Sequence, residues 1–211
     1  MDVRRLLPLS GLVFVVLALL SVVGFGGDTP GSTAPGSEVL SFYDDETVRQ
    51  AIGALVLAAS VPFLVFFAVS LANAIAPADP QRQPLWERVL VTGSGVAAAV
   101  LLVTAFIHFA LADGGDNGVS PEAMQAVNLL DGNTWVAFNG GLGVMMLGAA
   151  GLLLPRARNY RWLGWVALVL GVALFIPYAD FIALLLTLVW IVVTSVMLFR
   201  ERGEGRYASV A

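Results

Sequence analysis

Apolar positions along this chain gather into six long runs that are separated by short polar segments. The runs cover residues 6–24, 51–75, 89–112, 135–154, 163–177 and 181–199. A hydrocarbon core of about 30 Å needs roughly 20 apolar residues in a helix that rises about 1.5 Å per residue. The pattern therefore predicts six transmembrane helices, of which the fifth is short.

The predicted fold class is all-α, a polytopic membrane bundle that forms a single domain over residues 1–200 and ends in a short cytoplasmic tail over residues 201–211. Composition agrees, because a chain with 58% hydrophobic and only 12% charged residues is too apolar for a soluble core of its size. The first run is about 18 residues long and lacks a clean small-x-small cleavage site, so we expect an uncleaved first helix rather than a secretory signal peptide.

The arginines predict an orientation for this bundle. All 11 basic residues are Arg, and Arg49 alone falls in a segment predicted to lie outside. The other ten lie at the chain ends or in loops on the opposite side: Arg4, Arg5, Arg82, Arg88, Arg156, Arg158, Arg161, Arg200, Arg202 and Arg206. Arg-rich short loops stay in the cytoplasm. We therefore expect a protein of the cytoplasmic membrane with both termini inside and ten of its 15 acids outside.

Two outer loops contain segments that look helical. In the first loop, Ser37 is a candidate N-cap for residues 37–43, whose apolar side would lie on the outer membrane interface. In the second loop, Ser120 is the candidate N-cap and Pro121 takes the first helical position. The bundle is therefore expected to carry a short helix in each of its first two outer loops.

The same two loops share a sequence pattern. Gly26-Gly27-Asp28 corresponds to Gly114-Gly115-Asp116, and Asp44-x-x-Thr47 corresponds to Asp131-x-x-Thr134. Two interpretations stay open: a repeated helical hairpin, or chance similarity between two capped loops in a glycine-rich chain. A repeat can frame a transport site but does not by itself indicate a transporter.

Four polar residues are candidates for a cluster in the outer leaflet, where a polar side chain is costly and needs a partner. His108 is the only histidine and falls near the outer interface, and Asp180 ends the short fifth helix below the outer surface. We expect Asp180 to pair with Arg49 or His108, and Asn139 to join them by an interhelical hydrogen bond. Both a structural pair and a cation or substrate contact stay open, and Arg49 has Asp44, Asp45 or Glu46 as alternative partners.

Other features narrow the possible chemistry. The chain has no cysteine, so thiolate chemistry and thiol-bound metals are excluded. No cofactor fingerprint, metal-ligand cluster or basic nucleic-acid patch is recognisable. Gly93-Ser94-Gly95 is not a nucleophile elbow, and we expect this segment and the glycines of residues 140–151 to allow close helix packing. We predict no catalytic residue, cofactor or metal site, and no binding of nucleic acid.

Several short motifs resemble those of a large group of small six-helix membrane proteins that are abundant in high-GC Gram-positive bacteria. The matching residues are Gly27, Asp28, Pro30, Glu38, Phe42, Tyr43, Arg49 and the segment Arg161 to Trp165. The resemblance spans nearly the whole chain and implies the six-helix fold. It implies no activity, because this group has no assigned substrate, cofactor or catalytic residue.

Three functions follow as hypotheses. The leading one is a non-enzymatic membrane protein whose outer face, including Glu38, Phe42 and Tyr43, contacts a protein or lipid partner. The alternative is a small secondary transporter or ion-coupled carrier that uses His108, Asn139 and Asp180 in an outward vestibule. A third is an enzyme acting on lipid, which requires His108 and the outer acids to lie within about 3 Å of each other or of a substrate.

Overall fold

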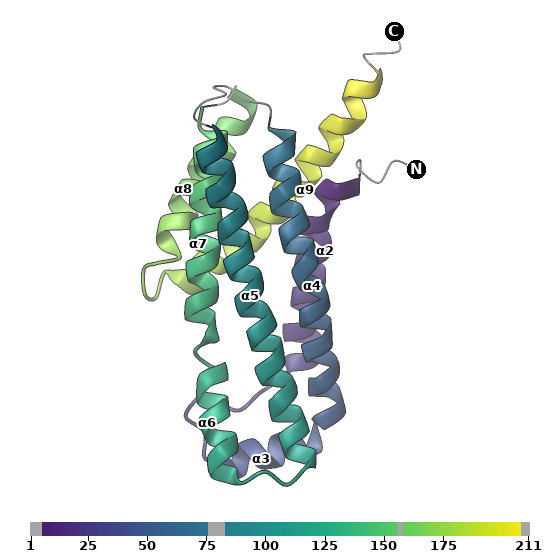
Figure 1. The fold of residues 1–211 in the computed structure, drawn as a ribbon, viewed down its shortest axis with the longest axis vertical. Helices are drawn as coiled ribbons and strands as arrows, with labels where there is room; N and C mark the ends of the chain where they lie inside the picture. Colours follow the sequence, from purple (N-terminus) through teal and green to yellow (C-terminus); the bar gives the residue numbers. More distant parts are fainter. Residues whose placement is uncertain (1–5, 76–82, 156–157, 208–211) are drawn as a thin grey trace. The chain divides into compact units, whose positions relative to one another are not determined.

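The computed structural model describes residues 6–75, 83–155 and 158–207, and over these residues the chain is helical with no strand. Figure 1 shows the elements in chain order. They are η1 (Leu7–Leu9), α2 (Ser10–Leu19), η2 (Leu20–Gly26), α3 (Gly36–Asp45), α4 (Thr47–Ala74), α5 (Gln83–Asp116), α6 (Pro121–Asp131), α7 (Thr134–Leu153), α8 (Arg158–Ala173) and α9 (Asp180–Tyr207). The predicted all-α class is confirmed for these residues.

Five helical stretches in the described residues are long and apolar enough to cross a membrane. They are Leu7–Gly26, Thr47–Ala74, Leu85–Asp116, Pro121–Leu153 and Asp180–Glu201. Helix α8 has only 16 residues, a rise of about 24 Å, which is shorter than a typical hydrocarbon core. The sixth span therefore stays a prediction. So does the orientation, for which Arg4, Arg5, Arg82 and Arg156 lie outside the described residues.

The helices run further than the apolar runs that predicted them. Helix α5 includes Trp86 and Glu87 before its apolar run and Asp113 to Asp116 after it. Helix α9 continues through the predicted cytoplasmic tail to Tyr207. Backbone hydrogen bonding does not require apolar side chains, so a helix continues past the apolar segment until a turn interrupts it.

The contacts of the chain group into two compact units. Unit 1 comprises residues 1–15, 62–98 and 139–211, and unit 2 comprises residues 16–61 and 99–138. Helices α2, α4, α5 and α7 contribute residues to both units.

Unit 1 is held together by glycines at which two backbones come close. A methyl group at Gly141 of α7 would come within 2.5 Å of the backbone nitrogen of Ala97 in α5, and one at Gly148 would overlap the backbone of Leu90. These positions need a residue without a side chain, which is how helices in membranes approach closely. The predicted close packing is confirmed at both, whereas Gly140 and Gly95 face open space.

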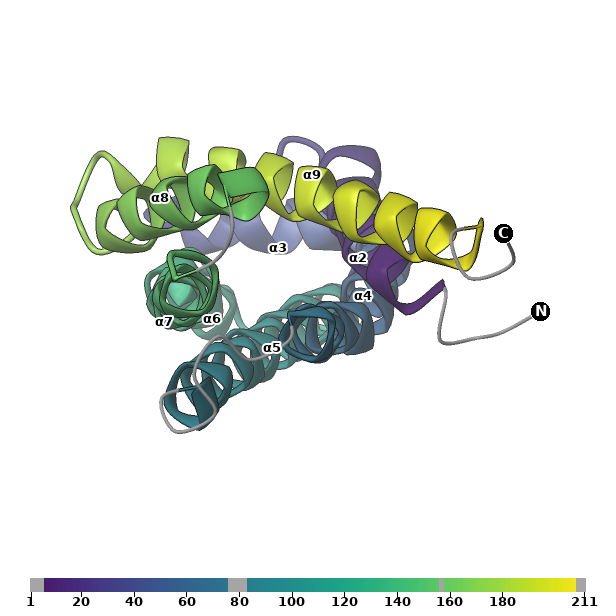
Figure 2. The same cartoon turned by 90° about the horizontal axis from the view of Figure 1, so that it is seen from above.

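The rest of unit 1 is built around α8 and α9, which lie side by side (Figure 2). Trp190 of α9 is buried, and its indole N–H donates to the carbonyl oxygen of Leu163 at 3.1 Å. Its ring meets Phe67 edge-on, with centroids 6.3 Å apart. Trp190 therefore packs inside unit 1.

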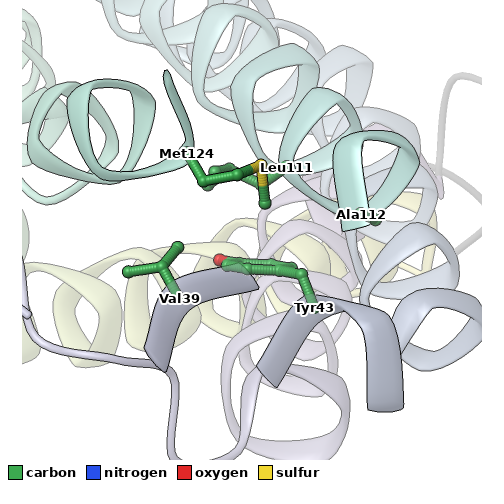
Figure 3. Close-up of a cluster of buried hydrophobic side chains, with 5 residues drawn as sticks. All are labelled: Val39, Tyr43, Leu111, Ala112 and Met124. Carbon is green, nitrogen blue, oxygen red and sulfur yellow. The ribbon is translucent and has the colours of Figure 1, made fainter. Parts of the chain in front are cut away.

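Unit 2 has a different core, in which the two loop helices α3 and α6 pack on each other. Val39 and Tyr43 lie one turn apart on α3 and are fully buried, and Figure 3 shows them facing Leu111 of α5 and Met124 of α6. Both loop helices were predicted. The expectation that Val39 and Tyr43 lie on the membrane interface is wrong, because α6 and the end of α5 cover them.

The two loop helices begin differently. Ser120 caps α6 as predicted, since its hydroxyl accepts the Ala123 N–H at 3.4 Å and Pro121 follows it. Helix α3 begins at Gly36 after Pro35, without a side-chain cap, so the prediction that Ser37 caps it is wrong. A methyl group at Gly36 would overlap the carbonyl of Pro121, so the start of α3 meets the start of α6 at a position that only glycine fits.

Candidate functional site

The single histidine belongs to a polar pair within unit 2. His108 lies on α5, and its Nδ1 is 2.9 Å from Oδ1 of Asp131, the last residue of α6. The side chains are only 23% and 13% exposed. The enzyme hypothesis required an outer acid near His108 but did not single out Asp131, because Asp131 lies 23 residues from His108 and no local pattern indicates the contact.

Tyr43 lies beside this pair. Its ring fills the unit 2 core, and its hydroxyl is buried without a hydrogen-bond partner among the described residues. Burial raises the pKa of the Tyr43 phenol, and the nearby negative charge of Asp131 raises it further. Tyr43 therefore stays neutral at physiological pH and acts as a core residue rather than an acid.

A cavity of about 160 Å³ opens next to His108, and we call it the His108 cavity. Its walls come from the π-helical segment η2 and the loop after it, and from α4 and α5. They consist of Ser21, Val22, Gly26, Gly27, Thr29, Gln50, Gly53, Ala54, Leu57, Thr104 and His108. The volume corresponds to roughly five waters at about 30 Å³ each. A cavity of this volume can hold only a small molecule.

Hydrogen bonds hold the cavity wall in shape. The Ser21 hydroxyl donates to the carbonyl of Gly53 at 2.8 Å, which ties η2 to α4. The Gln50 amide donates to the carbonyls of Phe25 at 3.1 Å and Gly26 at 3.0 Å. Ser21 and Gln50 are both more than nine-tenths buried. Sequence reasoning missed both, although a polar residue within or beside an apolar run is a recognisable signal.

A second concavity of unit 2, about 630 Å³, lies at the junction of α3 and α4, and we call it the acidic groove. It is lined by four carboxylates and one guanidinium, together with Phe25, Thr47, Val48 and Ile52. The charged residues are Asp44, Asp45, Glu46, Arg49 and Asp116. It shares no residue with the His108 cavity.

Arg49 belongs to this groove rather than to a buried cluster. Its guanidinium lies 3.5 Å from the Glu46 carboxylate, and both side chains are exposed. It also lies over Gly27, a residue with positive φ where a methyl group would come within 2.5 Å of the guanidinium. Glu46 was one of the alternative partners expected for Arg49. Such an exposed pair contributes little stability, about 0–1 kcal/mol.

The predicted polar cluster of Arg49, His108, Asn139 and Asp180 is divided between the units. Arg49 and His108 belong to unit 2, where they pair with Glu46 and Asp131 rather than with each other. Asn139 and Asp180 belong to unit 1 and are buried. Within unit 1 the Asp180 Oδ1 accepts the N–H of Phe181 at 2.9 Å, and the expected pairing with Arg49 or His108 stays a prediction.

Asn139 does not make the interhelical hydrogen bond that we expected. Both polar atoms of its side chain are buried and have no partner within the described part of the chain. An unpartnered buried amide costs about 1–3 kcal/mol. Among the described residues of unit 1, Asn139 and Asp180 therefore make no hydrogen bond to each other.

The predicted outer contact residues have unequal exposure. Glu38 is exposed, Phe42 is half-buried against the unit 2 core, and Tyr43 is completely buried. Tyr43 is therefore corrected from a contact residue to a core residue. The exposed charges next to it, Asp44 and Asp45, line the acidic groove instead.

The His108–Asp131 distance meets the geometric requirement of the enzyme hypothesis, which stays untested. Ser21 lines the same cavity, yet its hydroxyl donates to Gly53 rather than to His108. A serine is activated by donating its proton to the base. Among the described residues, no group of three or more His, Asp and Glu side chains is placed to hold a metal ion.

No protein-family model matches this chain, and no curated protein or solved structure is significantly similar to it. The resemblance to small six-helix membrane proteins of high-GC Gram-positive bacteria stays a prediction. Function is therefore argued from the two sites of unit 2 alone.

Proposed function

We propose that this protein is a non-enzymatic membrane protein whose unit 2 binds a basic segment of a partner protein in the acidic groove. The observation that carries the proposal is the groove itself, a concavity of about 630 Å³ with four carboxylates and one arginine on its wall. Complementary charge guides the encounter of two proteins and selects against wrong partners.

The charge of the whole unit supports this proposal. Unit 2 contains nine Asp and Glu residues and one Arg, a formal charge of −8. A negative surface of this size repels the anionic headgroups of bacterial lipids, which attract basic segments instead. A basic protein segment therefore fits the groove better than a lipid does.

The packing of α3 on α6 also supports a binding role. Tyr43 and Met124 form a core beneath the two helices, so the groove wall is held in place before a partner arrives. A preformed site loses little conformational freedom on binding, which favours affinity. Flexible loops of the same composition would lack this advantage.

We further propose that the groove faces outward and that both chain ends lie in the cytoplasm. The charges of the two units support this orientation, because unit 1 contains ten Arg and six acids whereas unit 2 is strongly negative.

Cysteine labelling tests the orientation. The natural chain has no cysteine, so single-cysteine variants label cleanly. Glu38→Cys in intact cells is expected to react with an impermeant maleimide, and Glu201→Cys only after lysis. The reverse pattern would overturn the orientation.

Binding is tested with the full-length protein in phosphatidylcholine nanodiscs and a fluorescent oligo-arginine peptide as the probe. Fluorescence anisotropy should show saturable, salt-sensitive binding. We expect Asp44→Asn combined with Asp45→Asn to weaken it roughly tenfold, because two groove charges are lost.

The control is Asp113→Asn combined with Glu122→Gln, which removes the same charge outside the groove. This variant should bind within about twofold of the natural protein. Equal loss in the two double variants would mean that the peptide senses the overall charge and not the groove, which would contradict the proposal.

A second experiment looks for the partner in its native membrane. Val48 lines the groove and is 72% exposed, so a photo-crosslinking amino acid at this position should form a discrete protein adduct. The adduct should disappear in the Asp44→Asn, Asp45→Asn background and persist in the control background. An adduct that forms equally in both backgrounds would show that the groove charges do not select the partner.

A small carrier is the second candidate function, and the His108 cavity favours it. The site of this carrier would centre on His108 and Asp131 rather than on the predicted trio with Asn139 and Asp180. In proteoliposomes, a pH-jump flux assay should then show activity that is lost in His108→Ala and Asp131→Ala but kept in Asp180→Asn. Absence of flux in the natural protein would remove this candidate.

A further inference from the structure

In the His108 cavity, most side-chain donor hydrogens are already bonded to backbone carbonyl oxygens. The Ser21 hydroxyl hydrogen is used by the Gly53 carbonyl, and that of Thr104 by the Val100 carbonyl at 3.0 Å. Both amide hydrogens of Gln50 are used by the carbonyls of Phe25 and Gly26. These donors are therefore already satisfied by the protein.

His108 also directs a ring nitrogen to a group of the protein, the Asp131 carboxylate. When the imidazole is neutral, the 2.9 Å contact between Nδ1 and the Asp131 carboxylate, which accepts, favours the tautomer with its hydrogen on Nδ1. In this tautomer the second ring nitrogen, Nε2, carries a lone pair, and it makes no hydrogen bond to any residue that the structure describes. His108 therefore contributes an acceptor to the cavity that it lines.

Among the lining side chains, what remains for a ligand is mainly a set of acceptors. They are the lone pairs of the Ser21 and Thr104 hydroxyls, the Gln50 Oε1 and the His108 Nε2, and only Thr29 keeps an uncommitted hydroxyl. A ligand that satisfies acceptors must carry donors. The formal charge of −8 on unit 2 adds a preference for a cation.

We propose that the His108 cavity binds a small organic cation with N–H donors, that is, a primary ammonium group on a short apolar chain. The ammonium group donates to Gln50 Oε1, Thr104 and His108 Nε2. Ala54 and Leu57 line the same cavity and accommodate the alkyl part. The volume of about 160 Å³ admits a ligand with only a few non-hydrogen atoms, so millimolar affinity is expected.

This proposal does not rest on partner binding in the acidic groove, since the two concavities share no lining residue. The ammonium group has two possible sources, a free amine in solution or the headgroup of an ethanolamine lipid. Both present the same donors to the cavity. The experiment separates them by the lipid composition of the nanodisc.

The probe is n-butylammonium, and the readout is the imidazole ¹⁵N spectrum of the full-length protein in phosphatidylcholine nanodiscs. His108 is the only histidine, so its resonances need no assignment among histidines. Saturable shifts of the Nε2 resonance are expected at millimolar n-butylammonium. Empty nanodiscs provide the correction for partitioning of the amine into lipid.

Two comparison ligands of equal heavy-atom count test the chemistry. Tetramethylammonium has the same charge but no N–H donor, and 1-butanol has a donor but no charge. Neither should shift the resonance at the same concentration. A shift with tetramethylammonium that equals that with n-butylammonium would overturn the role of the donors, and an equal shift with 1-butanol would overturn the preference for a cation.

Matched variants locate the site. Thr104→Val removes one acceptor and should weaken n-butylammonium binding about fivefold. Thr187→Val is the control, because Thr187 makes the same hydrogen bond to the carbonyl four residues before it but lies in unit 1. Equal affinity in the two variants would place the binding outside the cavity.

His108→Asn keeps a donor for Asp131 and removes Nε2, so calorimetry should show a loss of at least tenfold. Binding at natural strength would overturn the assignment of His108.

Adding phosphatidylethanolamine to the nanodisc distinguishes the two possible sources of the ammonium group. Competition with n-butylammonium would identify the lipid headgroup as an occupant, and unchanged binding would identify a soluble amine.

Discussion

The two units of this molecule hold their helices together in different ways. In unit 1, α5 and α7 touch through their backbones at Gly141 and Gly148. In unit 2, short helices with one apolar side enclose a core around Tyr43, and side chains such as Gln50 bond to the backbone of a neighbouring segment. The formal charges also differ: +4 for unit 1, from ten Arg and six acids, and −8 for unit 2.

This difference reflects two solvents. Apolar side chains gain little from leaving lipid, so helices in a bilayer associate by close packing of small residues. Helices α3 and α6 instead follow the rule for water, with one buried side and one exposed polar side. Unit 2 therefore combines a membrane part with a small core of the soluble type, and both candidate sites lie within this unit.

The largest effect should come from removing the centre of the unit 2 core. We expect Tyr43→Ala to cost about 3–5 kcal/mol in the free energy of unfolding, as for other buried aromatic residues. Hydrogen exchange should show lost protection in α3 and α6 but retained protection in α8 and α9. The control is Ser41→Ala, which changes an exposed residue of α3 and should leave the exchange pattern unaltered. Uniform loss along the chain would show that the units do not behave separately.

The corresponding experiment on unit 1 uses two neighbouring glycines. Gly141→Ala places a methyl group against the Ala97 backbone and should cost about 1–3 kcal/mol, the usual range for overpacking. Gly140→Ala meets open space and should be neutral or stabilising by up to about 1 kcal/mol, because alanine favours helix. Denaturation in mixed micelles measures both. Equal effects of the two substitutions would contradict backbone packing as the basis of unit 1.

A titration experiment probes the polarity of the unit 2 core. The raised pKa of Tyr43 means that the folded protein holds the phenolic proton more tightly than the unfolded chain does. Stability is unaffected below the ordinary tyrosine pKa of about 10 and falls above it, by about 1.4 kcal/mol per pH unit until the folded-state pKa is reached. Tyr43→Phe should lack this decline between about pH 10 and 11. It should also be as stable as the natural protein at pH 7, because the lost hydroxyl has no partner.

Much of the fold was predictable because it depends on local pattern. The apolar runs located the long helices, and Ser120-Pro121 located the start of α6. The helix ends were less predictable, since α9 passes without interruption from its apolar part to Tyr207. Helix α3 was predicted with the wrong start, because its first residue is determined by the contact of Gly36 with Pro121.

The candidate sites were less predictable than the fold. Chemical rarity identified His108, but its partner Asp131 is brought to it by the packing of α6, which no local pattern reveals. Tyr43 was expected to lie at the membrane interface. It is a core residue instead, because α6 packs on α3, a contact that no local pattern reveals either. The ligand preference proposed for the His108 cavity depends on which hydrogen atoms of Ser21 and Gln50 already have an acceptor. That is a property of the folded backbone and not of the sequence.

The smallest effect concerns how the two loop helices of unit 2 begin. Ser120→Ala removes the cap of α6 and should cost about 0.5–1 kcal/mol, the lower part of the usual range because the bond is long at 3.4 Å. Ser37→Ala is the matched control and should have no measurable effect, since α3 has no side-chain cap. Hydrogen exchange at the first turns of α3 and α6 measures each effect locally. Faster exchange in α3 after Ser37→Ala would restore the cap predicted from the sequence and contradict a start set by the contact between Gly36 and Pro121.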